Sequence, residues 1–307
     1  MIWNIGTDCS GIEAPIQALL QLNIKHKHIF SSDIDKHVIK SIKANYNPLH
    51  IFNDITIRDM EKVPDIDIYV CGFPCQTFSL IGNREGFLDK RGIVFFSCLD
   101  VIKNKNPKFF ILENVKGLFS HNKGKTFQTI LEHLESLENY SIYWEILNTK
   151  DYGIPQNRSR IFFVGIRTDV QTQPFNFPDI LPMKNINSFI DNNNNNKQDA
   201  PNRIKSTNYL SKIPEHSVFV DFSLYGHSTF PTSDKYTPCI LRKSEFWCVP
   251  KHRHASCEEL LSLQGFPTTL KQSVSTTQFK YQIGNSMSVN VLKSLFTEIF
   301  KSMLFTK

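Results

Sequence analysis

Short apolar segments alternate with segments of helical spacing over the first half of the chain, and this alternation limits the fold more than any other feature. Strand-like segments are predicted at residues 2–7, 28–32, 66–71, 108–113, 140–148 and 160–167. Helical spacing is predicted at residues 12–22, 36–46, 92–103 and 125–137. Strands that alternate with helices of this length are typical of an α/β fold with a mostly parallel central sheet and helices on both faces.

The amino-acid composition of the sequence changes near Pro174. Prolines, an uninterrupted run of asparagines at 192–196 and short aromatic-rich pieces follow, and helical spacing returns only near the C-terminus, at 256–263 and 281–304. A polar run of this kind is typical of a low-complexity loop. The sequence therefore predicts three parts: a main domain at 1–176, a small irregular domain at 177–251, and a segment at 252–307 that returns to the main domain.

Charge and cysteine content restrict the class of protein. The net charge of +6 permits a polyanionic partner without requiring one. No stretch approaches the length of a membrane span, and the first residues lack the basic segment of a signal peptide. Seven cysteines at scattered spacings favour a reducing, intracellular compartment over a disulfide framework. Nothing in the sequence indicates an obligatory protein partner, so a monomer is expected.

Cys75 stands in a stiff loop. A strand-like segment leads directly into Gly72-Phe73-Pro74-Cys75-Gln76. Gly72 permits a sharp exit from the strand, while Pro74 fixes its own φ and restricts Phe73. A cysteine presented this rigidly is a candidate nucleophile. The alternative is an inert structural thiol, because free cysteine is among the most buried residue types.

The first predicted strand ends in a turn at residues 6–13, where small residues let a nucleotide-like ligand approach the backbone. In open parallel sheets such ligands bind beyond the carboxyl ends of the strands. Asp33 follows the second strand, about 20 residues after Gly11, where an acid would hydrogen-bond ribose hydroxyls. The turn lacks a full G-x-G-x-x-G pattern, which favours a mononucleoside ligand over a dinucleotide. The alternative for Asp33 is the N-cap of the helix predicted at 36–46.

Five segments fall in a fixed order across nearly the whole chain, and together they resemble the motifs of cytosine-5 DNA methyltransferases. In chain order these segments are Gly72-Phe73-Pro74-Cys75-Gln76, Glu113-Asn114-Val115, Gln156-x-Arg158-x-Arg160, Arg253 with Glu259 and Leu263-Gln264-Gly265-Phe266-Pro267, and Gly284-Asn285-Ser286. The resemblance implies a Rossmann-like methyltransferase fold that uses S-adenosylmethionine. Residues 1–176 would then be the catalytic and cofactor-binding domain, and 177–251 a small target recognition domain.

The resemblance also implies a reaction on cytosine in double-stranded DNA at a short specific site. Cys75 would attack C6 of a base extruded from the helix, since a stacked base is out of reach. Glu113 would hydrogen-bond or protonate N3, for which it must carry a proton near neutral pH. Arg160 would bind O2 of the ring, with Arg158 supporting it, because guanidinium is a planar donor.

Two further sets of residues follow from the resemblance alone. Ser286, in the first set, also fits a buried helix N-cap. The expected cofactor-binding residues are Asp8, Gly11, Asp33, Ile34, Asp54, Ile55, Phe73, Asn285 and Ser286. The expected DNA-binding residues are Gln76, Ser79, Asn114, Gln156, Thr237 and Arg242.

The first motif departs from the family pattern at several positions. An acid is usual where Thr7 stands, an aromatic residue where Cys9 stands, and a glycine where Glu13 stands. Asp8 is expected to replace the missing acid one position later. Ile34 replaces a common aromatic residue that stacks on adenine.

Three alternatives remain open at this point. A branch of the same family methylates cytosine in tRNA, but it favours Pro-Pro-Cys where this chain has Phe73-Pro74-Cys75. A catalytically weak DNA-binding homologue would explain the altered first motif, although the reactive residues are intact. A zinc site is not expected, because the candidate ligands are not paired at short Cys-x-x-Cys spacing; the candidates are Cys239, Cys248, His252, His254 and Cys257.

Overall fold

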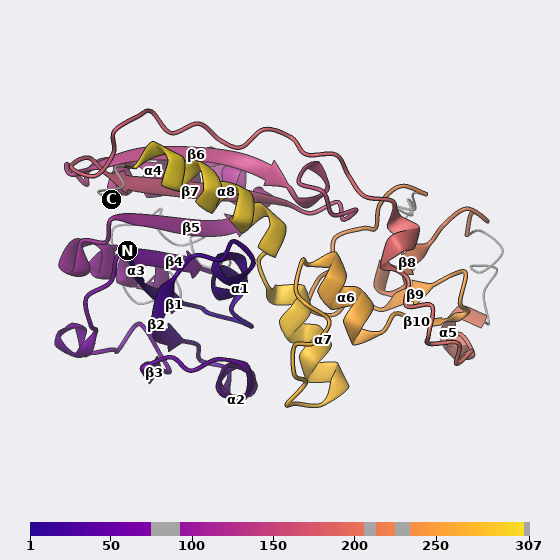
Figure 1. Ribbon diagram of the computed structural model, residues 1–307. Coiled ribbons are helices and arrows are strands. Elements are labelled where there is room, and N and C mark those ends of the chain that lie inside the picture. Colours follow the sequence, from indigo (N-terminus) through magenta and orange to yellow (C-terminus); the bar gives the residue numbers. More distant parts are fainter. Residues whose placement is uncertain (75–92, 206–212, 225–233, 304–307) are drawn as a thin grey trace. The chain divides into compact units, whose positions relative to one another are not determined.

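The computed structural model describes residues 1–74, 93–205, 213–224 and 234–303. The chain divides into two compact units (Figure 1). The first contains 1–147, 159–179 and 292–307, and the second contains 148–158 and 180–291. This division differs from the boundaries expected at 176 and 252, because 148–158 and 252–291 belong to the second unit. Cys75, Gln76 and Ser79 lie outside the described residues.

The first unit is built on a seven-stranded sheet in the order β3-β2-β1-β4-β5-β7-β6 (Figure 1). The strands β1 to β5 pair in parallel, and β7 runs antiparallel to β5. The mostly parallel sheet predicted from the sequence is therefore confirmed, while the short strand β3 was not predicted. The strands are Trp3–Asp8 (β1), His26–Ser32 (β2), His50–Phe52 (β3), Ile68–Gly72 (β4), Phe109–Val115 (β5), Tyr140–Asn148 (β6) and Ser159–Arg167 (β7).

Helices cover both faces of this sheet, as the alternating pattern predicts. Phe110 belongs to a buried cluster with α3 and α4, whereas its neighbour Phe109 packs its ring on Phe296 and Phe300 of α8. Successive strand residues point to opposite faces, so β5 is apolar on both sides. The helices are Ala14–Gln21 (α1), Lys36–Asn45 (α2), Ile93–Lys105 (α3), Lys125–Glu135 (α4) and Val289–Ser302 (α8), with short 3₁₀ turns at Met60–Lys62, Lys116–Phe119 and His121–Gly124. A further 3₁₀ turn, Thr149–Asp151, belongs to the second unit.

The second unit holds a small antiparallel sheet in the order β10-β9-β8 with a separate apolar cluster around Trp247 and Phe222. Asparagine-rich and proline-rich connections surround it, in agreement with the irregular texture of the sequence. Its elements are Ile186–Phe189 (η6), Asn202–Lys205 (α5), Phe219–Asp221 (β8), Phe222–Leu224 (η8), Phe246–Cys248 (β9), Arg253–His254 (β10), Cys257–Leu263 (α6) and Thr276–Asn285 (α7).

One helix expected at 281–304 is wrong, because the structure contains α7 and α8 with a break between them. Ser286 adopts an extended conformation as the C-cap of α7, so its alternative as a helix N-cap is also wrong. Its carbonyl oxygen accepts a hydrogen bond from Arg158 Nη2 at 2.7 Å. A side-chain donor thus satisfies one of the carbonyls that a helix end leaves without an intrahelical partner. No helix in the described part of the chain is long and apolar enough to cross a membrane.

Candidate active site

The carboxyl ends of four neighbouring strands bring the candidate residues of the first unit to one edge of the sheet. Asp8 at the end of β1 pairs with Cys71 of β4, and Gly72 of β4 pairs with Glu113 of β5. Ser32 at the end of β2 lies on the other side of Asp8. The strand order reverses direction at β1, and ligands of open α/β sheets bind at such a point.

The turn after β1 is shaped by three residues in left-handed conformation: Cys9 (φ 48°), Gly11 (φ 54°) and Glu13 (φ 61°). Ser10 fastens the turn, because its amide donates to the carbonyl of Ser32 at 2.9 Å. A Cβ atom built on Gly11 would meet no atom of the described residues within 4 Å. The turn is therefore rigid underneath and open above Gly11, which fits the close approach of a ligand to its backbone.

Asp33 lies at the open turn and binds backbone rather than capping a helix. Its carboxylate accepts hydrogen bonds from the amides of Gly11 at 3.1 Å and Asp35 at 2.9 Å. Asp35 is the N-cap of α2 and accepts from the amide of His37 at 2.8 Å, so the N-cap alternative for Asp33 is wrong. Burial raises the pKa of the Asp33 carboxyl group.

Asp8 does not replace the missing acid of the first motif. Its side chain is fully buried and forms a bidentate ion pair with Arg58, with N–O distances of 2.7 and 2.8 Å. Tyr69 donates a further hydrogen bond to Asp8 at 2.7 Å. The Arg58 guanidinium also lies over the rings of Phe30 and Phe52. The expected contact of Asp8 with a cofactor is therefore corrected to a structural role.

The remaining cofactor candidates of the first unit differ in exposure. Ile34 is 79% exposed beside Asp33. Ile55 is buried and Phe73 is 2% exposed, with its ring packed on Phe95. Asp54 accepts from both the amide and the hydroxyl of Thr56, which fixes its side chain.

Asn114 fastens the segment that leads toward Cys75. Its amide nitrogen donates to the carbonyl of Phe73 at 2.8 Å, and its side-chain oxygen accepts from the amide of Val115 at 2.8 Å. The side chain is 2% exposed. Asn114 was expected to bind DNA, and the structure instead places it as a clamp between β5 and the end of β4.

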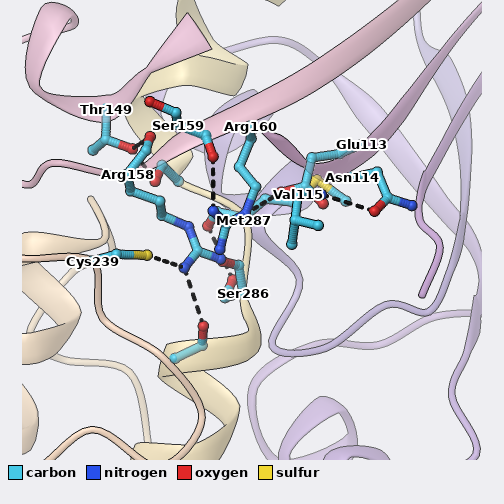
Figure 2. A network of polar contacts seen from close by, with 12 residues as sticks. Glu113, Asn114, Val115, Thr149, Arg158, Ser159, Arg160, Cys239, Ser286 and Met287 are labelled. Atoms are coloured by element: carbon cyan, nitrogen blue, oxygen red, sulfur yellow. Dashed lines mark hydrogen bonds and ion pairs between the residues drawn. The ribbon is translucent and has the colours of Figure 1, made fainter. Parts of the chain in front are cut away.

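Glu113 and Arg160 form an ion pair at the same edge of the sheet (Figure 2). Arg160 Nε lies 3.3 Å from Glu113 Oε1, and Nη1 donates to the carbonyl of Ser159 at 2.8 Å. The antiparallel register pairs Arg160 with Val115, which puts Arg160 and Glu113 on one face of the sheet. The expected convergence of these two residues is thus present, with both side chains largely buried.

Arg158 is committed to the backbone of the second unit (Figure 2). Its guanidinium donates to the carbonyls of Ile240 at 2.8 Å, Gly284 at 3.3 Å and Ser286 at 2.7 Å, and contacts Cys239 Sγ at 3.4 Å. The residue is 3% exposed. These contacts give Arg158 a structural role, in place of the expected support of Arg160 at the base.

Gln156 and Thr237 are also internal to the second unit and were expected to bind DNA. Both are fully buried, and the backbones of the two segments pair with each other. Gln156 donates to the carbonyl of Leu263 at 2.7 Å and accepts from the amide of Ile240 at 3.1 Å. Both residues were expected to contact DNA. The structure instead shows that they hold segments of the second unit together.

A family model for the C-5 cytosine-specific DNA methylases matches residues 9–301. The chain belongs to this family of DNA (cytosine-5-)-methyltransferases. It is 36% identical over 276 residues to the Type II methyltransferase M.BsuFI of Bacillus subtilis, covering 88% of this chain and 66% of that protein. It is 35% identical over 289 residues to M.NgoBI of Neisseria gonorrhoeae, covering 91% of this chain and 87% of that one.

Solved structures share the methyltransferase fold. The Dnmt2 methyltransferase of S. pombe superimposes with a TM-score of 0.70 at 21% identity, covering 97% of this chain and 98% of that chain. A putative DNA modification methyltransferase from an E. coli prophage has a TM-score of 0.69 at 18% identity, covering 98% and 99% of the two chains. At these identities the likeness shows the fold alone.

Two late candidates of the methylase chain lie at the surface of the second unit. Asn285 is exposed at the end of α7, and Arg242 is exposed with its guanidinium over the ring of Tyr281 at 5.5 Å. Gly284 has no room for a side chain, because a Cβ there would lie 2.2 Å from the carbonyl oxygen of Leu241. This close approach explains a glycine in the last motif. In the described ranges, no three histidine, cysteine or acidic side chains gather as a metal site would require.

Arg58 and Tyr69 were missed at the level of sequence, and Gln264 was named there only within a motif, without a role. Gln264 is fully buried, and its side chain donates to the carbonyl of Ile283 and accepts from Gln156. Arg58 and Tyr69 meet Asp8 from 50 and 61 residues away. A pairing over this sequence distance cannot be predicted from a short-range pattern. The one available signal was the single arginine in the aspartate-rich segment 54–67.

Proposed function

We propose that this methylase transfers the methyl group of S-adenosylmethionine to C5 of cytosine in double-stranded DNA at a short specific site. One observation carries the proposal: the sheet register pairs Glu113 with Gly72, the last residue of β4 and three residues before Cys75. Arg160 is in contact with Glu113. In this proposal the thiol attacks the pyrimidine ring, while the acid and the guanidinium stabilise the charge that develops on it. The Type II relatives support a restriction–modification context.

Cys75 is the proposed nucleophile toward C6 of the cytosine. A thiolate suits this step because sulfur is intrinsically nucleophilic. Addition at C6 makes C5 electron-rich, and loss of the C5 proton with release of Cys75 restores the ring after methyl transfer. Because a stacked base hides C6, the target nucleotide is extruded from the duplex.

Glu113 and Arg160 stabilise the charge that develops on the ring. In the proposal Glu113 donates a proton or a strong hydrogen bond to N3, and Arg160 donates to O2. Their contact supports these positions, because it holds both groups at one place before the base arrives. To donate to N3, Glu113 must leave its ionised pair with Arg160 and take up a proton. Arg158 and Asn114 are positioning residues in this scheme, since their own polar groups are bound to backbone carbonyls.

The turn after β1 is the proposed site of S-adenosylmethionine, which supplies the electrophilic methyl group. The open space above Gly11 and the carboxylate of Asp33 fit a ribose beside the backbone, and the exposed Ile34 fits an adenine face. Asp54 is the proposed acceptor for the adenine amino group, with the buried Ile55 supporting it. Phe73 is assigned a smaller part in the same pocket, and Asn285 and Ser286 of the second unit are kept as cofactor candidates on their motif alone.

The second unit is proposed to recognise the DNA target. Exposed Arg242 is the retained candidate for DNA contact, because a surface guanidinium can reach phosphates or base edges. Gln76 and Ser79, in the segment outside the described residues, remain predicted DNA contacts. Short sites are expected because the irregular region is small.

Bisulfite sequencing of a plasmid carried in cells that express the protein tests this function, with Cys75→Ala as the matched control. Conversion-resistant cytosines in one repeated context are expected for the wild type and not for the variant. Purified protein is then incubated in parallel with plasmid and with tRNA in the presence of labelled S-adenosylmethionine. Label in tRNA alone contradicts the DNA substrate, and no label with either nucleic acid contradicts the enzyme.

A further inference from the structure

Glu13 is a buried acid in a backbone conformation that favours glycine. Its φ of 61° and ψ of 52° lie in the left-handed region, directly before α1. Its side chain is 0% exposed. Charged side chains are almost never buried to this extent unless they are paired, so the contacts of the carboxylate define its purpose.

The Glu13 carboxylate joins the ends of two strands. Oε1 accepts hydrogen bonds from the hydroxyls of Thr7 on β1 at 2.8 Å and Ser31 on β2 at 2.6 Å. Thr7 and Ser31 are themselves paired in the parallel register. His28 Nε2 lies 3.4 Å from the same oxygen and 2.9 Å from the Ser31 hydroxyl. The carboxylate is thus fixed beneath the turn that carries Gly11.

The backbone of Glu13 closes that turn and opens the following helix. Its amide donates to the carbonyl of Ser10 at 3.0 Å, and its carbonyl accepts from the amide of Gln17 at 3.0 Å. Glu13 makes no side-chain N-cap contact with α1. The side chain therefore turns toward the sheet. Its hydrogen bonds stabilise the left-handed backbone conformation of Glu13, which a glycine would adopt without such contacts.

We propose that Glu13 is a positioning residue of the cofactor turn: its carboxylate reaches β1 from the helix side, accepts hydrogen bonds from Thr7 and Ser31, and thereby fixes the turn that carries Gly11. Asp8 is excluded from that role because Arg58 and Tyr69 occupy its carboxylate. The two departures at positions 7 and 13 are then one coupled exchange. The proposal rests on the proposed cofactor function of this turn.

A double-mutant cycle tests the exchange with four proteins: the wild type, Glu13→Gly, Thr7→Asp, and Thr7→Asp with Glu13→Gly. Coupled residues in contact typically give interaction energies that correspond to several-fold to a hundredfold changes in an equilibrium constant. Glu13→Gly is expected to weaken binding of S-adenosylhomocysteine by about tenfold. Thr7→Asp alone is also expected to weaken it, because two carboxylates then share one buried place. The double variant is expected to return to within about threefold of the wild type.

Controls separate this role from general loss of structure. Asn23 is exposed and has a similar φ of 56°, so Asn23→Gly measures the backbone change alone and should leave binding unchanged. Glu13→Gln keeps an acceptor oxygen and should retain most of the affinity. The KM for DNA should change less than twofold in every variant with measurable methylation, because the turn does not contact DNA in the proposal.

Thermal unfolding without ligand provides a second cycle that does not depend on methylation. The double variant should unfold at a higher temperature than the sum of the two single changes predicts. Strictly additive effects in unfolding and binding overturn the proposal, as does a Glu13→Gly protein that binds as tightly as the wild type. If the wild type binds no S-adenosylhomocysteine but the unfolding cycle is coupled, the exchange stands and the proposed cofactor function fails.

Discussion

Replacement of Arg58 by methionine should destabilise the first unit more than any surface change nearby. Asp8 and Arg58 have side-chain exposures of 0% and 2% and share two hydrogen bonds. Removal of one partner of a buried ion pair typically costs about 3–5 kcal/mol, because the other charge stays buried without compensation. For a domain of 150–250 residues this lowers the melting temperature by about 6–20 °C.

The assay is urea unfolding combined with amide hydrogen exchange at β1, which follows the first unit by itself. Lys62→Met is the matched control. Lys62 lies four residues after Arg58 and belongs to an exposed ion pair with Asp59. Exposed pairs contribute about 0–1 kcal/mol, so this variant should unfold almost as the wild type does. Addition of Asp8→Asn to Arg58→Met should recover about 1 kcal/mol or more, because the uncompensated charge is gone.

Two results would refute this reasoning. One is an Arg58→Met protein that loses less than about 1 kcal/mol and matches the Lys62→Met control. The other is a double variant with Asp8→Asn that is less stable than Arg58→Met alone, since the cost would then not come from the unpaired carboxylate.

Three further predictions concern the edge of the sheet and the second unit. Asn114→Ala removes the donor to the Phe73 carbonyl and should lower kcat for methylation while the Kd of S-adenosylhomocysteine changes less than threefold; calorimetry and single-turnover assays measure the two, and a pure loss of cofactor binding contradicts it. Arg158→Met should lower the unfolding free energy of the second unit by about 2–4 kcal/mol, whereas Arg160→Met should mainly lower kcat; equal stability losses in urea unfolding would contradict this difference. Burial raises the pKa of Asp33, so the folded state holds that proton at pH values where the unfolded chain has lost it, and the unfolding free energy falls as pH rises from about 4 through the raised pKa. Asp33→Asn should remove this part of the pH dependence in urea titrations, and an unchanged profile would contradict the assignment.

The first half of the fold was predictable because its determinants are local. Apolar runs of strand length and helical spacing define β1, β2, β4 and β5 within a few residues, and parallel pairing then brings their carboxyl ends together. The neighbourhood of Glu113 and the segment toward Cys75 follows from that topology. The break between α7 and α8 was missed, and the long-range contact at this point, from Arg158 to the carbonyl of Ser286 128 residues later, leaves no local pattern.

The same limit applies to the site residues. Motif position identifies Arg158, Gln156 and Thr237 as important, but burial and partners decide whether they contact a substrate or the chain itself. Asp8 shows the point most clearly, since an acid in a cofactor turn is easily assigned to a ligand when its partner arginine is 50 residues away. Roles of this kind depend on tertiary contacts that no local pattern contains.

The pairing of β1, β4 and β5 also fixes the distances between the segments that carry the proposed reacting groups. Neighbouring strands lie about 4.8 Å apart, a spacing that the backbone hydrogen bonds maintain whatever the side chains are. Three segments leave the sheet from consecutive strands at this spacing: the turn with Gly11, the segment after Gly72 and the end of β5 at Glu113. Insertions or substitutions elsewhere in the chain therefore leave the interval between these three points unchanged. A methylase built in this way can acquire a new target sequence without a new arrangement of its reacting groups.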